Sequence, residues 1–512
     1  MAMNWFLGAI IGLLIYGFGL SIYRLWFHPL SKYPGPRLAA LTRWYVAWYI
    51  YRGVFYRHVR DLHNQYGDVV RTGPDLIHFN SPATMVDIYG AQANVLKTDE
   101  FQVLNIAGSS TIFSAVKKNV HAFKRRTLLP LFNDRSLQPY SDRILRYIER
   151  YTSLLGQGTN LSNTSKGNWG PPIRLGEETF CLLYDITSDI ALGQSLEMLT
   201  SPDWRFVPSL MLRISRRSGM GIAQPLLCKL GIGALMFVTS FAQMRSLVTH
   251  ILHHVERRLS SSGTFTQKEM VSPMATAQDK NGFKYTTGDI ASEITLLIFA
   301  GADTTASAMT NAYAYLLHHP SILSRLTDEI RSTFANVDEI RTGSKLTSCH
   351  LLYACLDETL RLMPVAANGS FRRVQRGGTK VGGDLIPAGT DISVSAYSLH
   401  RKASLFPSPD DFIPDRWLPG SENAVGRNGV PSDPHAFVPF SMGPRGCIGM
   451  KLSRMTMSIM LARVVFLYDL RWAPGPRCCH LKKPGQRCDE LNKAYLFAHA
   501  NEVKAQLRPR QT

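Results

Sequence analysis

One cysteine in the C-terminal part of the chain lies in a loop suited to chemistry. Residues 440–449 read FSMGPRGCIG, which places Cys447 directly before an expected helix that begins at Met450. A helix N-terminus favours an anion and nearby backbone N–H groups can bond a sulfur, so the loop favours a thiolate that binds a metal or attacks an electrophile. Arg445 adds a cation that can hold a carboxylate. A lone cysteine in a tight turn is more often an ordinary buried residue, so both interpretations stay open.

A second candidate set lies midway along the strongest helical signal, residues 289–318. Residues 300–305 read AGADTT, and the Gly in the helix interior costs about 1 kcal/mol relative to Ala, which needs a reason. Small residues on the face of Thr304 let a flat cofactor or O2 approach the backbone, and its hydroxyl can bond the Ala300 carbonyl and distort the helix. A solvated Asp303–Thr304 pair beside a helix–helix contact explains the same residues equally well.

Two pairs of charged residues have the spacing of neighbours on a helix. Glu358 and Arg361, at i and i+3, share a face of the helix expected over residues 348–362. As an exposed ion pair they would contribute at most about 0.5 kcal/mol. His121 and Arg125, at i and i+4, can both reach one anionic group, and a solvated basic turn is the alternative for His121.

The elements that position these residues are expected in one body, without repeats or Gly/Ser linkers. Hydrophobic residues make up 45% of the 512 residues and charged residues 19%, which excludes a disordered chain and leaves material for a large core. The pattern predicts a mainly α fold with small β-sheets. It predicts helices at 289–318, 348–362 and 449–468, strands at 68–79 and 380–396, and irregular segments at 363–378 and 402–447.

The N-terminal segment has the length and composition of a membrane anchor. From Trp5 to Tyr23 it holds 19 residues without a charge, about 28 Å as a helix against a hydrocarbon core of about 30 Å. A cleaved signal peptide would need a charged start and a small-residue cleavage site, which this segment lacks. The next residues, from Arg24 to Arg71, carry eight Lys or Arg and two acids, so this side should stay cytoplasmic. We predict a transmembrane anchor at 1–26, a Pro-rich hinge at 27–36 and a catalytic domain at 37–512.

The net charge of +19 is compatible with nucleic acid, anionic lipid or an acidic protein as partner. The chain has no zinc-finger spacing, RNA-binding signature or basic heptad run, so we expect a membrane surface and an acidic partner, and no nucleic acid. Eight cysteines are too sparse for a disulfide scaffold. The cluster of Cys478, Cys479, His480 and Cys488 fits no common zinc spacing, and its role stays open.

Residues 440–449 resemble the haem-binding signature of the cytochrome P450 family, with Phe440, Arg445 and Cys447 at the expected spacing. The resemblance implies haem b with the Cys447 thiolate as axial ligand of the iron. It also implies that Phe440 packs beside the sulfur side of the porphyrin and that Arg445 holds a propionate. The anchor, the HPLSKYPGP strap and the HxxxRR pattern are similar to those of membrane-bound members from filamentous fungi.

The helix motif takes its role from the same resemblance. Residues 300–305 resemble the family's acid–alcohol pair, in which Asp303 relays protons and Thr304 hydrogen-bonds the bound oxygen. Gly301 is then expected to lie against the cofactor. The four motifs follow the family's order and extend the resemblance over about residues 27–470.

The remaining charged residues resemble cofactor contacts and a structural network. His121 and Arg125 resemble a propionate clamp, although many members have Trp in place of His121. Arg372 or Arg373 resembles a further propionate contact; we favour Arg372, and the alignment is ambiguous by one residue.

A buried network is the third implication. Glu358 and Arg361, completed by Arg416 of the segment FIPDRW at 412–417, resemble the family's Glu–Arg–Arg network, which holds the cysteine loop in place. Asp415 and Trp417 depart from the commoner Glu and Phe.

The implied reaction is monooxygenation, in which one atom of O2 enters a C–H or C=C bond and the other leaves as water. Electrons are expected from NADPH through NADPH–cytochrome P450 reductase, with cytochrome b5 as an additional donor, because the chain has no convincing GxGxxG site. Lys117, Lys118, Lys124 and Arg126 are candidates for a basic docking face, and a solvated face is the simple alternative. Two other functions, an O2-independent isomerase or dehydratase and a non-catalytic haem protein, have less need of the acid–alcohol pair.

The sequence indicates the class of substrate only. By analogy the pocket walls are Phe101 to Phe113, residues 205–245, Leu297 and Val365 to Asn368, which are largely apolar and suit a lipophilic substrate or an ordinary core. The fungal resemblance suggests an intermediate of secondary metabolism (terpenoid, polyketide or alkaloid), with sterols and fatty acids as alternatives. It implies a single-pass protein of the endoplasmic reticulum membrane with its catalytic domain in the cytosol.

Overall fold

A computed structural model describes residues 2–157, 169–231, 238–260, 270–279, 282–426, 429–474 and 492–510. Most of the described chain is helical. The longer helices are α1 (Ala2–Ile22), α3 (Trp44–Tyr51), α4 (Phe55–Tyr66), α5 (Pro82–Tyr89), α6 (Lys118–Leu128), α7 (Asp134–Gln157), α8 (Leu175–Leu192), α9 (Val207–Ala223), α12 (Val238–Ser260), α14 (Thr287–His318), α15 (Pro320–Thr333), α17 (His350–Leu362) and α19 (Met450–Leu467). Short helical turns are η1 (Tyr23–Phe27), α2 (Arg37–Leu41), η2 (Asp99–Leu104), η3 (Leu129–Phe132), α10 (Pro225–Lys229), α13 (Val271–Thr276), η4 (Val337–Glu339), α16 (Ser344–Thr347), α18 (Ala396–Leu399), η5 (Pro414–Trp417) and η7 (Gly443–Arg445).

The β-structure is confined to small sheets, as predicted. One sheet has the order β1-β2-β8-β5-β3, a second has the order β4-β12-β9, and two hairpins pair β6 with β7 and β10 with β11. The strands are β1 (Val69–Gly73), β2 (Leu76–Phe79), β3 (Val95–Lys97), β4 (Ile173–Arg174), β5 (Arg372–Val374), β6 (Thr379–Val381), β7 (Asp384–Ile386), β8 (Asp391–Val394), β9 (Tyr468–Trp472), β10 (Lys493–Ala494), β11 (Ala498–His499) and β12 (Lys504–Pro509). Strand β5 lies within 363–378, a segment for which we predicted irregular structure, because it pairs with strands that are distant in sequence.

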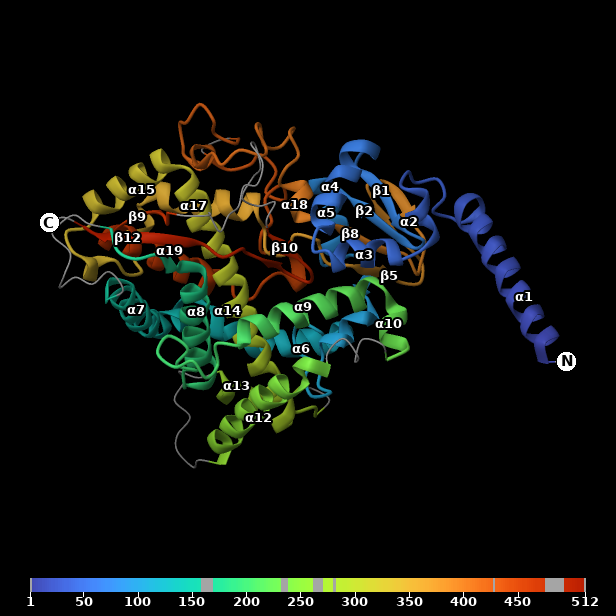
Figure 1. Ribbon diagram of the computed structural model, residues 1–512, viewed down its shortest axis with the longest axis horizontal. Helices are drawn as coiled ribbons and strands as arrows, with labels where there is room; N and C mark the ends of the chain where they lie inside the picture. The colour runs from blue at the N-terminus through green and yellow to red at the C-terminus, as the bar shows by residue number, and fades with distance from the viewer. Residues whose placement is uncertain are drawn as a thin grey trace.

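Helix α14 runs through the centre of the helical part and packs closely against α8 (Figure 1). Its start is fixed by a capping box, in which Thr286 Oγ1 accepts from the N–H of Asp289 at 3.1 Å and the Asp289 carboxylate accepts from the N–H of Thr286 at 3.0 Å. His319 caps its end, and Pro320 begins α15. Side chains along most of α14 are buried, so the helix is a core element whose few accessible residues need a reason.

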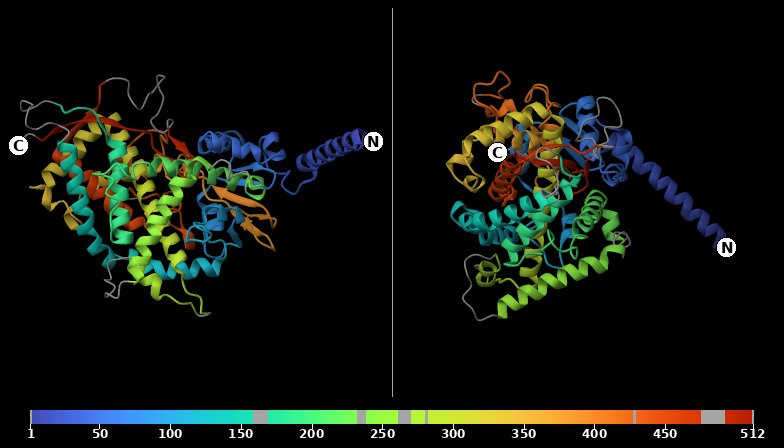
Figure 2. Two further views of the ribbon diagram at one scale, coloured as in Figure 1. Left: turned by 60° about the horizontal axis from the view of Figure 1, so that its bottom comes forward. Right: turned by 60° about the vertical axis from the view of Figure 1, so that its left-hand side comes forward.

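Helix α1 projects away from the body in all three views and does not pack along it (Figures 1 and 2). Residues 3–27 form the one helix, among the residues described, that is long and apolar enough to cross a membrane.

The strap that follows is attached to the body. Leu30 is fully buried, the Tyr33 hydroxyl donates to Asp384 Oδ2 at 2.9 Å, and the N–H of Arg71 donates to the Pro34 carbonyl at 2.8 Å.

Candidate functional site

The loop that carries Cys447 is fixed by a bond of its own backbone and by contacts with two helices, α5 and α6. The N–H of Cys447 donates to the Phe440 carbonyl at 2.9 Å, and Arg125 Nη1 of α6 donates to the Gly446 carbonyl at 2.8 Å. Gly443 has a φ of +68° and a Cβ there would lie 2.0 Å from the Tyr89 carbonyl oxygen, so only glycine fits. The loop therefore presents Cys447 in one conformation at the start of α19.

The Cys447 thiol is surrounded by protein but its side chain is open on one side. Burial raises the pKa of the thiol, and the N–H of Gly449 and the guanidinium of Arg125 act in the opposite direction. Both contacts therefore favour the predicted thiolate, and burial opposes it. The side chain nevertheless remains accessible, which leaves the sulfur free to bind a metal, and a metal takes the place of the proton.

The predicted hydrogen bond of Thr304 within the central helix is confirmed, and the helix runs without a break from Thr287 to His318. Thr304 Oγ1 donates to the Ala300 carbonyl at 2.6 Å, and in this part of α14 Ala300 is exposed and Thr304 half-buried. The next residue, Thr305, shares a hydrogen bond of 3.0 Å with Ser453 in the first turns of α19. This bond holds the Thr304 turn beside the helix that follows Cys447.

Gly301 serves a helix contact. A Cβ at Gly301 would lie 2.9 Å from Thr187 Cγ2 of α8, which is closer than packed carbon atoms approach. The Thr187 hydroxyl also donates to the Ile298 carbonyl of α14 at 3.2 Å. The space beside the Gly301 Cα in the Cβ direction is therefore filled by Thr187 and is not available to a flat cofactor. Ala300 is the small residue of this turn that is exposed.

Five basic side chains gather beside the Cys447 loop. None of them forms an ion pair with a carboxylate among the described residues. Four of them donate to backbone carbonyls instead: Arg445 to the carbonyls of Ala115 and Val116, Lys97 to that of Phe113, Arg125 to that of Gly446, and Arg372 to those of Ser370 and Phe371. Arg372 also donates to the Ser370 hydroxyl. Burial, followed by Arg445, Lys97, Arg125 and Arg372, lowers the pKa of His121 to about 3. The basic groups therefore oppose one another's charged forms, and an anion beside them would offset that opposition.

The two arginines at the ambiguous position have different partners. Arg373 donates to both oxygens of Asp391, at 2.8 and 3.0 Å. Arg372 is buried, and burial lowers its pKa while no carboxylate compensates it among the described residues. Arg372 is thus the arginine available to an anion. Lys97, its cross-strand neighbour in β3, was missed by sequence reasoning because the pairing joins segments far apart in the chain.

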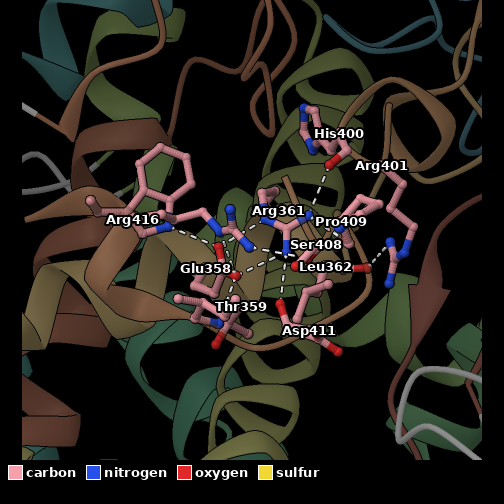
Figure 3. A network of polar contacts seen from close by, with 12 residues as sticks. Glu358, Thr359, Arg361, Leu362, His400, Arg401, Ser408, Pro409, Asp411 and Arg416 are labelled. Atoms are coloured by element: carbon pink, nitrogen blue, oxygen red, sulfur yellow. Dashed lines mark hydrogen bonds and ion pairs between the residues drawn. The ribbon is translucent and has the colours of Figure 1, made fainter. Parts of the chain in front are cut away.

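The Glu358, Arg361 and Arg416 side chains meet in one buried network (Figure 3). The carboxylate of Glu358 accepts from Arg361 Nε and Nη2 at 2.8 and 2.9 Å and from Arg416 Nε at 3.0 Å. It also accepts from the indole of Trp417 at 2.9 Å and from the N–H of Ile413 at 2.9 Å, two partners that the sequence did not indicate. Arg361 Nη1 and Nη2 reach three backbone carbonyls of the irregular segment after α18: those of His400, Pro409 and Asp411.

One residue assigned to the basic docking face is buried instead. Lys124 Nζ lies 2.8 Å from Glu293 Oε1 of α14, with both side chains at most 1% accessible. The ammonium also lies 4.7 Å from the centre of the Tyr285 ring. Lys124 therefore joins α6 to α14, and the prediction of a docking role for it is wrong because a partner distant in sequence neutralises it.

Two residues near the C-terminus, Phe497 and His499, lie beside residues that the sequence had singled out, and the motifs gave no signal for them. The Phe497 ring, in the turn between β10 and β11, lies 5.6 Å from the Phe113 ring, which lies 6.0 Å from that of Phe101. His499 of β11 lies beside Asp303. Phe440 packs on the edge of the main core. Cys478, Cys479, His480 and Cys488 lie outside the described residues.

Comparisons with known proteins agree with this arrangement. A family model described as cytochrome P450 matches residues 34–484. The chain is 31% identical over 462 residues to the cytochrome P450 monooxygenase poxM of Penicillium oxalicum, covering 90% of this chain and 88% of the relative. It is 29% identical over 474 residues to the cytochrome P450 monooxygenase atnE of Emericella nidulans, with coverages of 91% and 90%. A solved cytochrome P450DA heme domain matches with a TM-score of 0.71 at 16% identity, covering 91% and 95% of the two chains, and this likeness shows the fold.

Proposed function

Because the chain belongs to the cytochrome P450 family, we propose that Cys447 is the axial ligand of its haem b and that the buried basic cluster holds the haem propionates. Family membership makes the chain a monooxygenase that uses O2, a lipophilic substrate and a redox partner, and an isomerase or carrier role is not favoured. The observation that carries the site assignment is a cluster of basic side chains, with no carboxylate partner among the described residues, beside an accessible cysteine.

The residues present fit the cofactor. Two propionates would supply the negative charge that the basic cluster of Lys97, His121, Arg125, Arg372 and Arg445 lacks among its described partners. Bound haem supplies the activation of O2 and the oxidation of the substrate. The protein supplies the sulfur ligand, the fixed loop around it, and the accessible turn of α14 at Ala300 and Thr304.

The proton chemistry falls to the acid–alcohol pair. Burial raises the pKa of Asp303, which makes this carboxyl group a better proton carrier near neutral pH than an exposed aspartate. Thr304 holds its hydroxyl at the accessible turn through the bond to Ala300. We assign Asp303 the transfer of protons and Thr304 the hydrogen bond that positions the reacting oxygen.

Replacing Thr304 with valine tests this assignment with little change of volume. We expect the product formed per NADPH to fall on the order of tenfold or more and peroxide release to rise, because the oxygen loses its hydrogen-bond partner. Peroxide and NADPH are measured with the purified holoenzyme and its reductase. Thr310 is the matched control, since its hydroxyl makes the same bond to the carbonyl four residues earlier, at 2.8 Å, two turns farther along α14. Equal peroxide release from both variants would remove Thr304 from its role.

The electron donor and the location follow from charge and from the anchor. NADPH–cytochrome P450 reductase, assisted by cytochrome b5, is the proposed donor, with Lys117, Lys118 and Arg126 as candidate docking residues. Helix α1 is the proposed single membrane span, and the excess of Lys and Arg directly after it supports a cytosolic catalytic domain on the endoplasmic reticulum.

The proposed substrate is a lipophilic intermediate of fungal secondary metabolism, a terpenoid, polyketide or alkaloid. The support is the fungal origin of the relatives and the group of aromatic rings formed by Phe101, Phe113 and Phe497 in the region expected to form the pocket wall. We expect yeast that carries the protein and a matching reductase to add one oxygen atom to at least one fed scaffold of these classes, as seen by mass spectrometry. Oxidation of fatty acids alone would contradict the substrate class, and an inactive Cys447→His strain is the control.

A further inference from the structure

The carboxyl group of Asp303 faces a histidine from the far end of the chain. Asp303 Oδ2 lies 3.5 Å from Nδ1 of His499, and each side chain is only 9% accessible. His499 is placed there by the hairpin of β10 and β11, whose register sets it opposite Lys493 and whose turn carries Phe497. The same short segment thus places a ring beside Phe113 and an imidazole beside the Asp303 carboxyl group.

Both partners keep a polar atom free. Asp303 Oδ1 and His499 Nε2 are buried and have no hydrogen-bond partner among the described residues, and the hydroxyl of Tyr184 in α8 is in the same state. A buried polar atom without a partner costs about 1–3 kcal/mol. Retaining two of them in one contacting pair is unfavourable for stability alone, and such groups call for a functional explanation.

We propose that His499 is the proton-exchanging partner of Asp303, so that protons reach the acid from a buried imidazole of the C-terminal hairpin. The inference rests on the proposed function of Asp303 and names the residue that resupplies it. His499 gives the proton on Nδ1 to Asp303 Oδ2, and the carboxyl group passes a proton on to the oxygen atom that leaves as water. As Nδ1 gives its proton, Nε2 takes one from water, and proton exchange with water then returns the imidazole to the Nδ1–H form. The electrons come from the redox partner.

No other acid competes with Asp303 for the proton of His499 among the described neighbours. Three groups lie around the Asp303–His499 pair: Tyr184 of α8, Lys493 across the hairpin, and Tyr495. The ring centre of Tyr495 lies 6.4 Å from that of His499, and the Arg216 guanidinium lies 5.7 Å from the Tyr495 ring centre. Among the described residues none of these neighbours is a second carboxylate. Burial raises the pKa of Asp303 and His499 opposes that rise, so removing the imidazole leaves the carboxyl harder to ionise.

The test compares two oxidants on the purified holoenzyme, with guaiacol as the reporter. Cleavage of the O–O bond of hydrogen peroxide releases hydroxide unless a proton is moved onto it, whereas a peracid releases a carboxylate, which leaves without that help. For His499→Gln we expect peroxide-driven oxidation to fall on the order of tenfold at neutral pH. The acid limb of the pH–rate profile for peroxide should move to higher pH. The peroxide proton must go to an ionised Asp303, and this carboxyl is harder to ionise without the imidazole. Peracid-driven oxidation should stay unchanged.

The control and the outcomes separate this inference from the site assignment. His319→Gln is the matched variant, since His319 caps the far end of α14 and its ring bonds the Tyr315 carbonyl at 2.8 Å. If His499→Gln lowers both oxidations by one factor, or leaves the peroxide profile unchanged, His499 is a packing residue and the inference is overturned. If the wild-type holoenzyme oxidises guaiacol with neither oxidant, the proposed function of the site fails as well.

Discussion

Replacing Cys447 with histidine is expected to abolish monooxygenation while the protein still folds. The loop around Cys447 is held by backbone bonds and by Arg125, none of which needs the sulfur, so the variant keeps its loop. A histidine ligand removes the electron donation by which a thiolate favours O–O cleavage. We therefore expect the carbon-monoxide difference spectrum of the reduced protein to lose its red-shifted Soret band.

The measurement compares membranes that contain wild type and Cys447→His, with Cys228→Ser as the control. Cys228 is an accessible cysteine of α10, remote in sequence from the loop, and its replacement should leave the spectrum intact. A red-shifted band that persists in Cys447→His would assign the thiolate to another cysteine. Loss of the band in both variants would point to a folding defect instead of a lost ligand.

The sequence predicts best what depends on neighbours along the chain. The loop before α19, the turn at Thr304 and the pairing of Glu358 with Arg361 are local, because a fixed spacing on a helix or in a loop sets each of them. For the same reason the three longest predicted helices match α14, α17 and α19 to within about two residues. These are the parts of the site that carry a motif.

What the sequence could not predict depends on contacts between distant segments. Lys124 reads as a surface lysine until Glu293, 169 positions away, neutralises it inside the core. Lys97 joins the basic cluster through the pairing of β3 with β5, and His499 reaches Asp303 through a hairpin that lies beyond every motif. Each of these positions is set by tertiary packing, which no local pattern records.

Replacing Glu358 with alanine is expected to be the most destabilising change in the catalytic body. The substitution leaves Arg361 and Arg416 buried without their counter-charge, and breaking a buried pair in this way costs about 3–5 kcal/mol. Domains are stable by only about 5–15 kcal/mol, so a large share of the protein should lose its fold and its haem. Thermal unfolding of the solubilised holoprotein and its haem content measure the loss.

An exposed ion pair that joins the first turn of α19 to α7 gives the control. Lys451 Nζ lies 2.7 Å from Asp134 Oδ2, with side chains 51% and 83% accessible, so Asp134→Asn should change the free energy of unfolding by at most about 1 kcal/mol. If Glu358→Ala is no more destabilising than Asp134→Asn, the network of Glu358 contributes nothing to the fold.

The pH dependence of unfolding separates the charge of Glu358 from its packing. Burial alone would raise the pKa of this carboxyl, yet Arg361 and Arg416 outweigh it and the folded protein lowers the pKa. The stabilisation is therefore fully present above the pKa of an unfolded glutamate, about 4.3, and is lost as the pH falls through the lower folded value. Glu358→Gln keeps the shape but cannot ionise, so it should be destabilised at neutral pH and approach wild type in acid. A constant difference between the two proteins from neutral pH to acid would mean that shape, and not charge, is what Glu358 contributes.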